Sequence, residues 1–490
     1  MLDRRAFLTG AAGFAFLAGC GGNAITPKPQ PGLPWKALAK RLTGRVVLPG
    51  DSGYGILSRP NNLRYAFRRP AGIALCKNAN DVAASILWAR ENGVPVVARS
   101  GGHSYAGYST TTGLMIDVSP MRSLSFDRAG GILTVGGGAR NVTVFDGCRD
   151  LGVAIPHGRC FRVGVAGLAL GGGIGFDMRP NGVTSDTMTA TEIVTADGTM
   201  HRVGVNDDSD LFWACRGGGG GNFGINTSFS FQTFAVGRMT AFELWWDSDL
   251  EAVFERMVAA LEGAPNGMGN KVSVVLTPDA ITGKTQMKLQ LLGQLDGTSQ
   301  QLREILQPVY ALREPDEIRF VEELPYWQAE VKVSEPGLPT YFKERSRFFN
   351  QPFDGRAIAT AFDWCRRWPA TVKSAAFKAF QTGGAVNALP ASATAFVHRT
   401  SHWLASIDIV WSEDTSQGAL QKSLDWQTRF YDALVPIAKG GAYQNFIDPS
   451  LNDWKTAYYG ANIARLEAVK KRVDPNDVFT FPEAIPVHAS

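Results

Sequence analysis

The chain has 490 residues, too many for one compact core, so we expect two or three structural units. Its hydrophobic content of 44% and charged content of 19% are ordinary for a globular protein. The net charge is +4, from 49 basic and 45 acidic residues, and no basic stripe alternates with aromatic residues. These features argue against nucleic acid as a partner.

The N-terminal residues 1–20 predict an export signal. Arg4-Arg5 precede Phe7-Leu8, and residues 8–19 are apolar or small, a stretch too short for a membrane span but suited to a signal-peptide core. The pattern resembles a twin-arginine export signal, and the Leu-Ala-Gly-Cys20 end resembles a lipobox. An ordinary secretory signal cleaved near the same place is the alternative. We expect a periplasmic or cell-surface protein held to the membrane only by a lipid anchor at Cys20.

The cysteines bear on disulfides and metals. Five follow Cys20, namely Cys76, Cys148, Cys160, Cys215 and Cys365. None forms a Cys-x-x-Cys pair, so we expect no metal site. Five is an odd number in an oxidising compartment, so at least one cysteine should be unpaired, and a cofactor-linked cysteine would account for it.

The first half of the chain predicts a tether and then short alternating elements. Residues 21–55 contain four prolines between 27 and 34, typical of a semi-rigid lead-in. A helix is expected over 81–92, ending at Gly93, and a short apolar strand over 94–98. Strands at 132–135 and 193–195 are bounded by glycine turns, and this pattern continues to about residue 236.

The pattern changes after residue 236. Residues 241–246 alternate like a strand, and Asp247 opens a helix with apolar residues at helical spacing. Further strands are expected at 272–276, 287–295 and 407–411, followed by a C-terminal helix that ends near Asp474-Pro475. An antiparallel sheet covered by helices is therefore predicted.

The strongest chemical signal is the segment Arg99-Ser100-Gly101-Gly102-His103-Ser104-Tyr105. A strand followed by Ser-Gly-Gly presents several backbone N–H groups in one concavity that can bind phosphate oxygens, with Arg99 or Ser104 assisting. It is neither a Walker loop nor a GxGxxG motif. His103 would lie beside whatever the phosphates tether, although a histidine in such a turn is often only hydrogen-bonded.

Two more glycine loops follow. One runs from Gly158-Arg159-Cys160 through Gly175, and the other joins Arg216 to Gly217–Gly221 and Gly224. A single glycine run is usually a flexible loop, but three loops suit one extended ligand.

These three segments, in this order, resemble the FAD domain of vanillyl-alcohol-oxidase-type flavoproteins with a PCMH-type FAD-binding fold, and more narrowly the berberine-bridge-enzyme-like oxidases. The resemblance runs from about Arg68 to Phe234 and returns at Tyr443 to Ile485. It implies an α+β fold. The FAD-binding domain would cover residues 56–236, the inserted substrate domain 237–438, and the returning berberine-bridge-like segment 439–490.

In that family, the histidine of the Ser-Gly-Gly-His turn is bonded to the 8-methyl carbon of the flavin. The cysteine of the Cys-x-x-Val-Gly-Val segment is bonded to flavin carbon 6. Both match here, so the resemblance implies FAD linked through His103 and Cys160. A noncovalent flavin is the alternative. Further cofactor contacts are expected at Arg99, Ser100, Gly101, Gly102, Ser104, Val163, Gly164, Gly167, Gly172, Gly173, Gly175, Val194 and Asn445.

The segment from Tyr443 to Asp448 matches the family pattern Tyr-x-Asn-Tyr-x-Asp, which lines the flavin face and often supplies the catalytic base. The second tyrosine position is Phe446 here, which leaves Tyr443 as the only phenol of the motif. A free phenol with a pKa near 10 is a poor base, so its surroundings would have to lower that pKa. A core tyrosine is the alternative.

Three other positions are expected to lie near the flavin or the substrate. Val163 would lie beside the flavin face that meets oxygen, where a small residue goes with oxidase behaviour. Residues 395–399 resemble a strand that crosses over the flavin, so His398 could touch substrate, unless it is simply packed. His157 could border the flavin.

The resemblance implies two-electron oxidation of an alcohol carbon, with oxygen as acceptor and hydrogen peroxide as product. Family members oxidise sugars and oligosaccharides, and also alkaloids and other secondary metabolites. Twelve tryptophans would suit a sugar-stacking groove, so we favour a carbohydrate or related alcohol. A dehydrogenase that serves a quinone or periplasmic carrier, and a flavin-holding protein without catalysis, are the alternatives.

Overall fold

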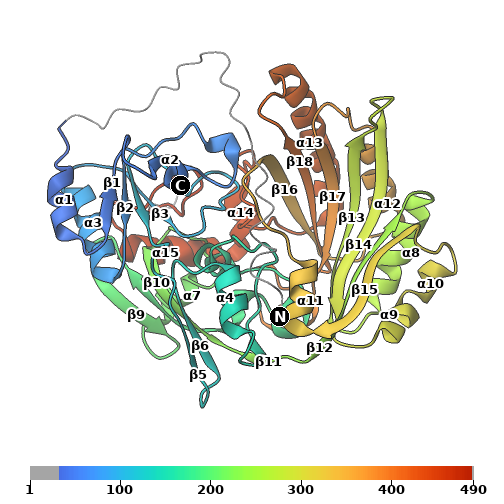
Figure 1. Ribbon diagram of the computed structural model, residues 1–490, viewed down its shortest axis with the longest axis horizontal. Helices are drawn as coiled ribbons and strands as arrows, with labels where there is room; N and C mark the ends of the chain where they lie inside the picture. Colours follow the sequence, from blue (N-terminus) through green and yellow to red (C-terminus); the bar gives the residue numbers. More distant parts are fainter. Residues whose placement is uncertain (1–31, 488–490) are drawn as a thin grey trace.

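The computed structural model describes residues 32–487, which form two adjoining halves (Figure 1). One half holds three small sheets and the other a single seven-stranded sheet. The predicted signal and anchor residues Arg4, Arg5 and Cys20 lie outside the described range. Within that range, no helix is both long and apolar enough to cross a membrane.

The first sheet of the cofactor half is mainly parallel. Its order is β1 (Arg45–Val47), β2 (Gly72–Leu75), β4 (Leu114–Asp117) and β3 (Val96–Arg99), with only the β1–β2 pair antiparallel. Parallel strands need a crossover connection, and α3 (Ala79–Glu91) supplies it from β2 to β3, with β4 lying between these two strands in the sheet. The α3 helix begins where the Asn78 side chain accepts a hydrogen bond from the Asp81 N–H.

The second sheet of this half is antiparallel. Its order is β5 (Leu124–Asp127), β6 (Ile132–Gly136), β10 (Ile225–Gln232), β8 (Met188–Val194) and β9 (Met200–Gly204). A third, two-stranded sheet pairs β7 (Val153–Ala154) with β11 (Phe234–Ala235). The remaining helices of this half are α1 (Trp35–Arg41), α2 (Tyr54–Ser58), α4 (Asn141–Cys148), α5 (Val165–Leu170), α6 (Met178–Asn181), α7 (Ser209–Ala214), α14 (Trp454–Tyr459) and α15 (Ile463–Val473).

The other half is one antiparallel sheet of seven strands. Its order is β15 (Glu317–Pro325), β12 (Arg238–Trp246), β14 (Thr285–Leu295), β13 (Met268–Pro278), β17 (Ser374–Gln381), β18 (Trp403–Trp411) and β16 (Tyr341–Phe349). Its helices are α8 (Leu250–Glu262), α9 (Ser299–Ile305), α10 (Gln307–Tyr310), α11 (Tyr326–Val333), α12 (Gly355–Arg366) and α13 (Gln417–Ala438). In Figure 1, α8, α12 and α13 lie on the side of the sheet away from the cofactor half, which leaves the opposite face toward the junction.

The α+β fold class is confirmed, with modest shifts at element ends. The α8 helix begins at Leu250 rather than at Asp247, because Asp249 takes a left-handed conformation with φ of 53° just before it. Its buried face carries Val253, Phe254, Met257, Val258 and Leu261, the apolar spacing expected of an amphipathic helix.

The C-terminal segment returns to the cofactor half after crossing the edge of the large sheet. The Arg345 guanidinium on β16 donates to Asp448 at 2.6 Å, and the Lys343 ammonium donates to Ser450 at 2.8 Å. The predicted domain limits at residues 236/237 and 438/439 fall just before β12 and just after α13.

Candidate functional site

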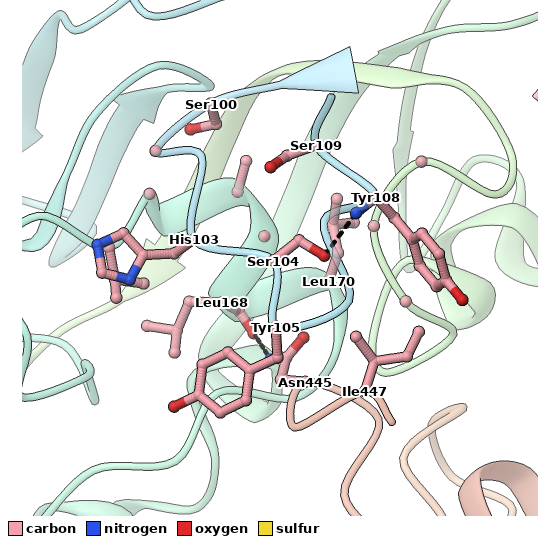
Figure 2. Close-up of a pocket in the computed structure, with 18 of the residues that line it drawn as sticks. Ser100, His103, Ser104, Tyr105, Tyr108, Ser109, Leu168, Leu170, Asn445 and Ile447 are labelled. Carbon is pink, nitrogen blue, oxygen red and sulfur yellow. Dashed lines mark hydrogen bonds between the residues drawn. The ribbon is translucent and has the colours of Figure 1, made fainter. Parts of the chain in front are cut away.

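A cavity of about 310 Å³ lies between the two halves. Its lining includes all three glycine loops, the C-terminal segment and one face of the seven-stranded sheet. Figure 2 shows the Ser100–Ser109 stretch along one wall, with Leu168 and Leu170 from α5 and Asn445 from the C-terminal segment close to it. Segments distant in the sequence therefore meet around one space.

The first glycine loop begins where β3 ends at Arg99. A Cβ at Gly101 would stand only 2.2 Å from the Gly164 backbone nitrogen, so glycine is needed for the first and second loops to touch. Ser104 Oγ accepts a hydrogen bond from the Tyr108 N–H at 3.0 Å, which fixes the turn (Figure 2). The Arg99 guanidinium donates to the carbonyls of Ser58 and Arg59, so a phosphate contact of Arg99 stays a prediction.

His103 is held as a neutral imidazole. Burial is the main cause that lowers its pKa to about 4, and the positive charge of Arg140 adds to this effect. Its Nε2 atom is buried and has no hydrogen-bond partner within residues 32–487. A neutral ring with one unengaged nitrogen has the character required of a nucleophile.

Cys160 faces the same space as a protonated thiol. Burial is the first cause that raises its pKa to about 11, and the Glu335 carboxylate raises it further, while Arg159 and Lys271 oppose them. The thiol donates to Glu335 Oε2 at 3.9 Å, which places a proton acceptor beside it. Forming a thiolate here therefore requires a proton to leave toward a base.

A strap of the inserted half, residues 334–340, holds these two side chains together. The strap pairs with the cysteine loop, because the Phe161 N–H donates to the Glu335 carbonyl at 3.0 Å. At Gly337, with φ of 64°, a Cβ would lie 3.1 Å from His103 Cε1 and 3.2 Å from Cys160 Cβ. One glycine therefore touches both residues predicted to link the flavin.

Tyr443 differs from the expectation of a lowered pKa. Its hydroxyl oxygen accepts hydrogen bonds from the N–H groups of Gly173 at 3.0 Å and Ile174 at 3.2 Å, and from Asn445 Nδ2 at 3.0 Å. Three donors favour the phenolate, but burial outweighs them and raises the pKa to about 12. The phenol is protonated at neutral pH, and Asn445 also donates to the Leu168 carbonyl at 2.9 Å.

The face of the large sheet that is turned toward the cavity brings charged side chains over Cys160. Strand register places Glu344 opposite Asp408, Lys378 opposite Ser406, and Lys271 opposite Phe380. Residues opposite each other in antiparallel strands share a face, so these side chains form one surface. Lys271, Glu344, Lys378 and Phe380 line the cavity, together with Glu335.

Glu344 and Lys378 lie within a paired network. Lys378 Nζ contacts Asp408 Oδ2 at 2.7 Å and Glu344 Oε1 at 3.4 Å, and the Ser406 hydroxyl donates to Glu344 Oε1 at 2.6 Å. Burial is the first cause that raises the pKa of Glu344. The two nearby carboxylates raise the pKa of Lys378 above its ordinary range and outweigh burial, so this lysine stays charged.

Most predicted cofactor contacts line the cavity, and three do not. Val163, Gly164, Gly167, Gly175 and Asn445 line it, as does every predicted residue of the first loop. Gly172 and Gly173 lie behind it, against Phe396 and the Tyr443 hydroxyl. Val194 is fully buried, and its carbonyl lies 2.5 Å from where a Gly224 Cβ would stand.

The predicted strand at 395–399 is wrong. The segment has no regular structure, because the Phe396 N–H donates to the Arg216 carbonyl and Arg399 pairs with Asp186 at 2.6 Å instead of joining a ladder. His398 stacks on Phe348 with ring centres 4.1 Å apart and does not line the cavity, so the packed alternative holds.

His157 also does not line the cavity. It stacks on Trp327 at 5.5 Å and meets the Tyr326 hydroxyl at 3.2 Å, in a buried group with Asp177 and Glu330. The Tyr326 hydroxyl donates to Asp177 at 2.5 Å and fills the space between the histidine and that carboxylate. This arrangement is a hydrogen-bonded junction between the two halves.

The sequence did not indicate the charged face of the large sheet or several other residues that line the cavity. The missed residues include Lys271, Glu335, Glu344, Lys378, Ser109, Phe481 and Glu483. Single charged residues inside otherwise apolar strands, such as Lys271 in β13, were the available signal, since buried charges need a partner or a function.

Comparisons with known proteins define the class of this site. Residues 70–204 match a family model described as an FAD binding domain, and residues 442–486 match one described as berberine and berberine like. The matches enclose His103, Cys160 and Tyr443. The protein is therefore an FAD-linked oxidoreductase.

Individual relatives span nearly the whole chain. An FAD-linked oxidoreductase of Bacillus subtilis, YgaK, is 31% identical over 460 residues, which are 91% of this chain and 97% of that protein. Glucooligosaccharide oxidase of Sarocladium strictum is 28% identical, and the match covers 85% of this chain and 87% of that protein. The wild-type structure of Physcomitrella patens BBE-like 1 superposes with a TM-score of 0.83 at 27% identity, over 93% of this chain and 100% of that one. The chain belongs to the berberine-bridge-enzyme-like family of FAD-linked oxidases.

Proposed function

We propose that this protein binds FAD through two covalent links, at His103 and Cys160, and oxidises an alcohol carbon of a carbohydrate. One arrangement supports the two covalent links. Among the residues that the structure describes, the neutral His103 ring has no hydrogen-bond partner at Nε2, and both His103 and Cys160 lie against Gly337. FAD supplies the hydride acceptor, and the chain must position the substrate and take one proton from its hydroxyl group.

The lining of the cavity supports a carbohydrate. Tyr105 stacks on Phe446 with ring centres 5.0 Å apart, which provides a flat aromatic wall. Glu344 and Lys378 lie on the sheet face above and offer acceptors and donors for several hydroxyl groups. Aromatic surface beside charged hydrogen-bonding groups matches a ring that is apolar on its faces and polar at its edges. Xylooligosaccharide oxidase from Myceliophthora thermophila, solved with xylobiose, has a similar fold, with a TM-score of 0.78.

Two groups of this chain can accept the hydroxyl proton. Tyr443 was the residue predicted from the motif, and its three donors would stabilise the phenolate once it forms. Glu344 has a carboxyl pKa that burial raises from its ordinary acidic value, which strengthens it as a general base. The role of Tyr443 stays a proposal beside that of Glu344, and the two titrate in different pH ranges.

Oxygen is the proposed electron acceptor, and bound FAD would supply the two electrons that, with two protons, convert it to hydrogen peroxide. The proposal rests on Val163, which lies in the cysteine loop, lines the cavity and is small enough to leave room for oxygen. Anaerobic mixing with sugars, followed by mixing with air, tests both half-reactions. If sugars reduce the flavin but air does not reoxidise it, the result would favour the dehydrogenase alternative. If no alcohol or sugar reduces the flavin, the result would favour a protein that binds flavin without catalysis.

Export and lipid anchoring rest on the sequence motif alone. We propose that replacing Arg4 and Arg5 by Lys strands the precursor in the cytoplasm. Cys20→Ser should give an unanchored or unprocessed protein. Unchanged membrane association of the Cys20→Ser protein would contradict the lipid anchor.

A further inference from the structure

The sheet face above the cavity holds one ammonium group with too few partners. Lys271 is 6% exposed and lies on β13, opposite Phe380 on β17. Within residues 32–487 its Nζ atom forms one ion pair, with Glu335 Oε1 at the long distance of 3.5 Å. An ammonium group has three N–H donors, so most of its hydrogen-bonding capacity is unused.

Glu335 does not neutralise Lys271, because it is already paired. The Arg159 guanidinium donates to the same Glu335 Oε1 atom at the shorter distance of 2.8 Å. Arg159 also donates to the Val333 carbonyl at 3.1 Å, which holds the guanidinium beside the strap. One carboxylate therefore serves two cations, and the guanidinium has the better geometry.

The neighbouring lysine shows the contrast. Lys378 lines the same face but contacts two carboxylates, Asp408 at 2.7 Å and Glu344 at 3.4 Å. Those contacts raise the pKa of Lys378, whereas burial and the charge of Arg159 lower the pKa of Lys271 to about 8. A buried cation without a close anion is costly unless a ligand supplies one.

We propose that the substrate carries a carboxylate and that Lys271 binds it, so that the preferred substrate is a sugar acid and not a neutral sugar. This inference rests on the proposed function. Cys160, the residue proposed to hold flavin carbon 6, lines the same cavity as Lys271, and the charge of Lys271 acts on its thiol. A carboxylate held at Lys271 would keep the rest of the sugar inside the cavity proposed to hold the flavin.

The test compares matched sugars on the holoenzyme. Glucose with glucuronate, and galactose with galacturonate, differ at carbon 6 and keep the remaining hydroxyl groups. Anaerobic stopped-flow flavin reduction should show the acid of each pair binding at least about tenfold more tightly, as expected of one charge-assisted contact. Equal or weaker binding of the acids, with the neutral sugars active, would overturn the proposal and leave the proposed function standing. Reduction by neither kind would count against the proposed function itself.

Two variants assign the preference to the side chain. Lys271→Met should abolish the difference between acid and neutral sugars, through a loss of affinity for the acids. Lys332→Met is the matched control, because Lys332 is a half-exposed lysine on α11 paired with Glu322. A preference that survives in Lys271→Met would overturn the assignment.

The wild-type protein gives a second readout that does not depend on a variant folding. The groups that act on Lys271 are Arg159, Glu335, Lys378 and Asp408. The charged ammonium is present below its pKa, so the preference for acids should be full near pH 6 and decline as the pH rises through about 8. A bound carboxylate moves that midpoint upward. A preference constant from pH 6 to pH 10 would overturn the proposal.

Discussion

The two walls of the cavity are built by different physical means. The cofactor wall consists of glycine loops at strand ends, where close backbone contacts such as that between Gly101 and Gly164 fix the shape. The opposite wall is a sheet face, where register alone brings Lys271, Lys378 and Glu344 together. The loops place the two residues proposed to link the flavin, while the sheet places the charges proposed to meet the substrate. Changes in one wall should therefore leave the task of the other largely intact.

The largest expected effect is the loss of both flavin links. In the protein carrying His103→Ala and Cys160→Ala, no yellow colour should remain in an acid-precipitated pellet, because no covalent bond survives. Each single variant should keep its colour through the other link. Cys148→Ala is the control, since Cys148 is buried outside the cavity. Full release of FAD from the wild-type protein would refute the double linkage.

The next largest effect is expected from removing the group that accepts the proton of the substrate hydroxyl. Loss of a general base typically lowers a rate by about 10²–10⁴. Glu344→Gln should cause this loss in flavin reduction if the carboxylate accepts the proton, whereas Tyr443→Phe should cause it if the phenol does. Substrate affinity should change little in the responsible variant, because the proton moves only in the transition state.

The pH profile separates these two groups in the wild-type protein. A base works in its ionised form, so the reduction rate should rise with pH through the pKa of the acceptor and then level off. For Glu344 the rise should lie above the ordinary range of a carboxyl group, since burial raises its pKa. For Tyr443, with a pKa of about 12, the rate should still be rising at the highest usable pH. A flat profile in wild type would place the base elsewhere.

A smaller effect is expected at Val163. In Val163→Leu, one added methylene should crowd the space proposed for oxygen, because tight sites respond to a single methylene. Reoxidation by air should slow, and reduction by substrate should barely change. A parallel fall in both half-reactions would indicate general damage, and an unchanged reoxidation rate would remove Val163 from the oxygen path.

The smallest effect is expected from a change in the contact between the first two glycine loops. In Gly101→Ala, the new methyl would stand 2.2 Å from the Gly164 nitrogen, so the two loops must separate. We expect about 1–3 kcal/mol of destabilisation in thermal unfolding, together with reduced flavin incorporation. Gly55→Ala, where no atom lies within 4 Å of the new Cβ, is the control and should unfold like wild type. Equal stability of the two variants would contradict the close contact of the loops.

The sequence predicted the cofactor wall because its requirements are local. A Ser-Gly-Gly-His turn and a Cys-x-x-Val-Gly-Val segment need particular residues at fixed spacing, since only glycine allows the backbone to approach so closely. His103 and Cys160 do meet in one cavity, at a glycine that no motif had marked. The long apolar strands and the α8 helix were likewise visible from periodicity.

The tertiary structure alone decided the substrate wall and the pKa values. Lys271, Glu344 and Asp408 come from three strands whose order in the sheet is not the order of the chain. Their meeting depends on register, and a slip of one residue would turn each side chain to the other face. In the same way, the pKa of Tyr443 rises because burial outweighs three donors, a balance that its motif could not reveal. The sequence by itself thus determined which cofactor the protein holds, and the packing of distant strands decided which charges face the cavity.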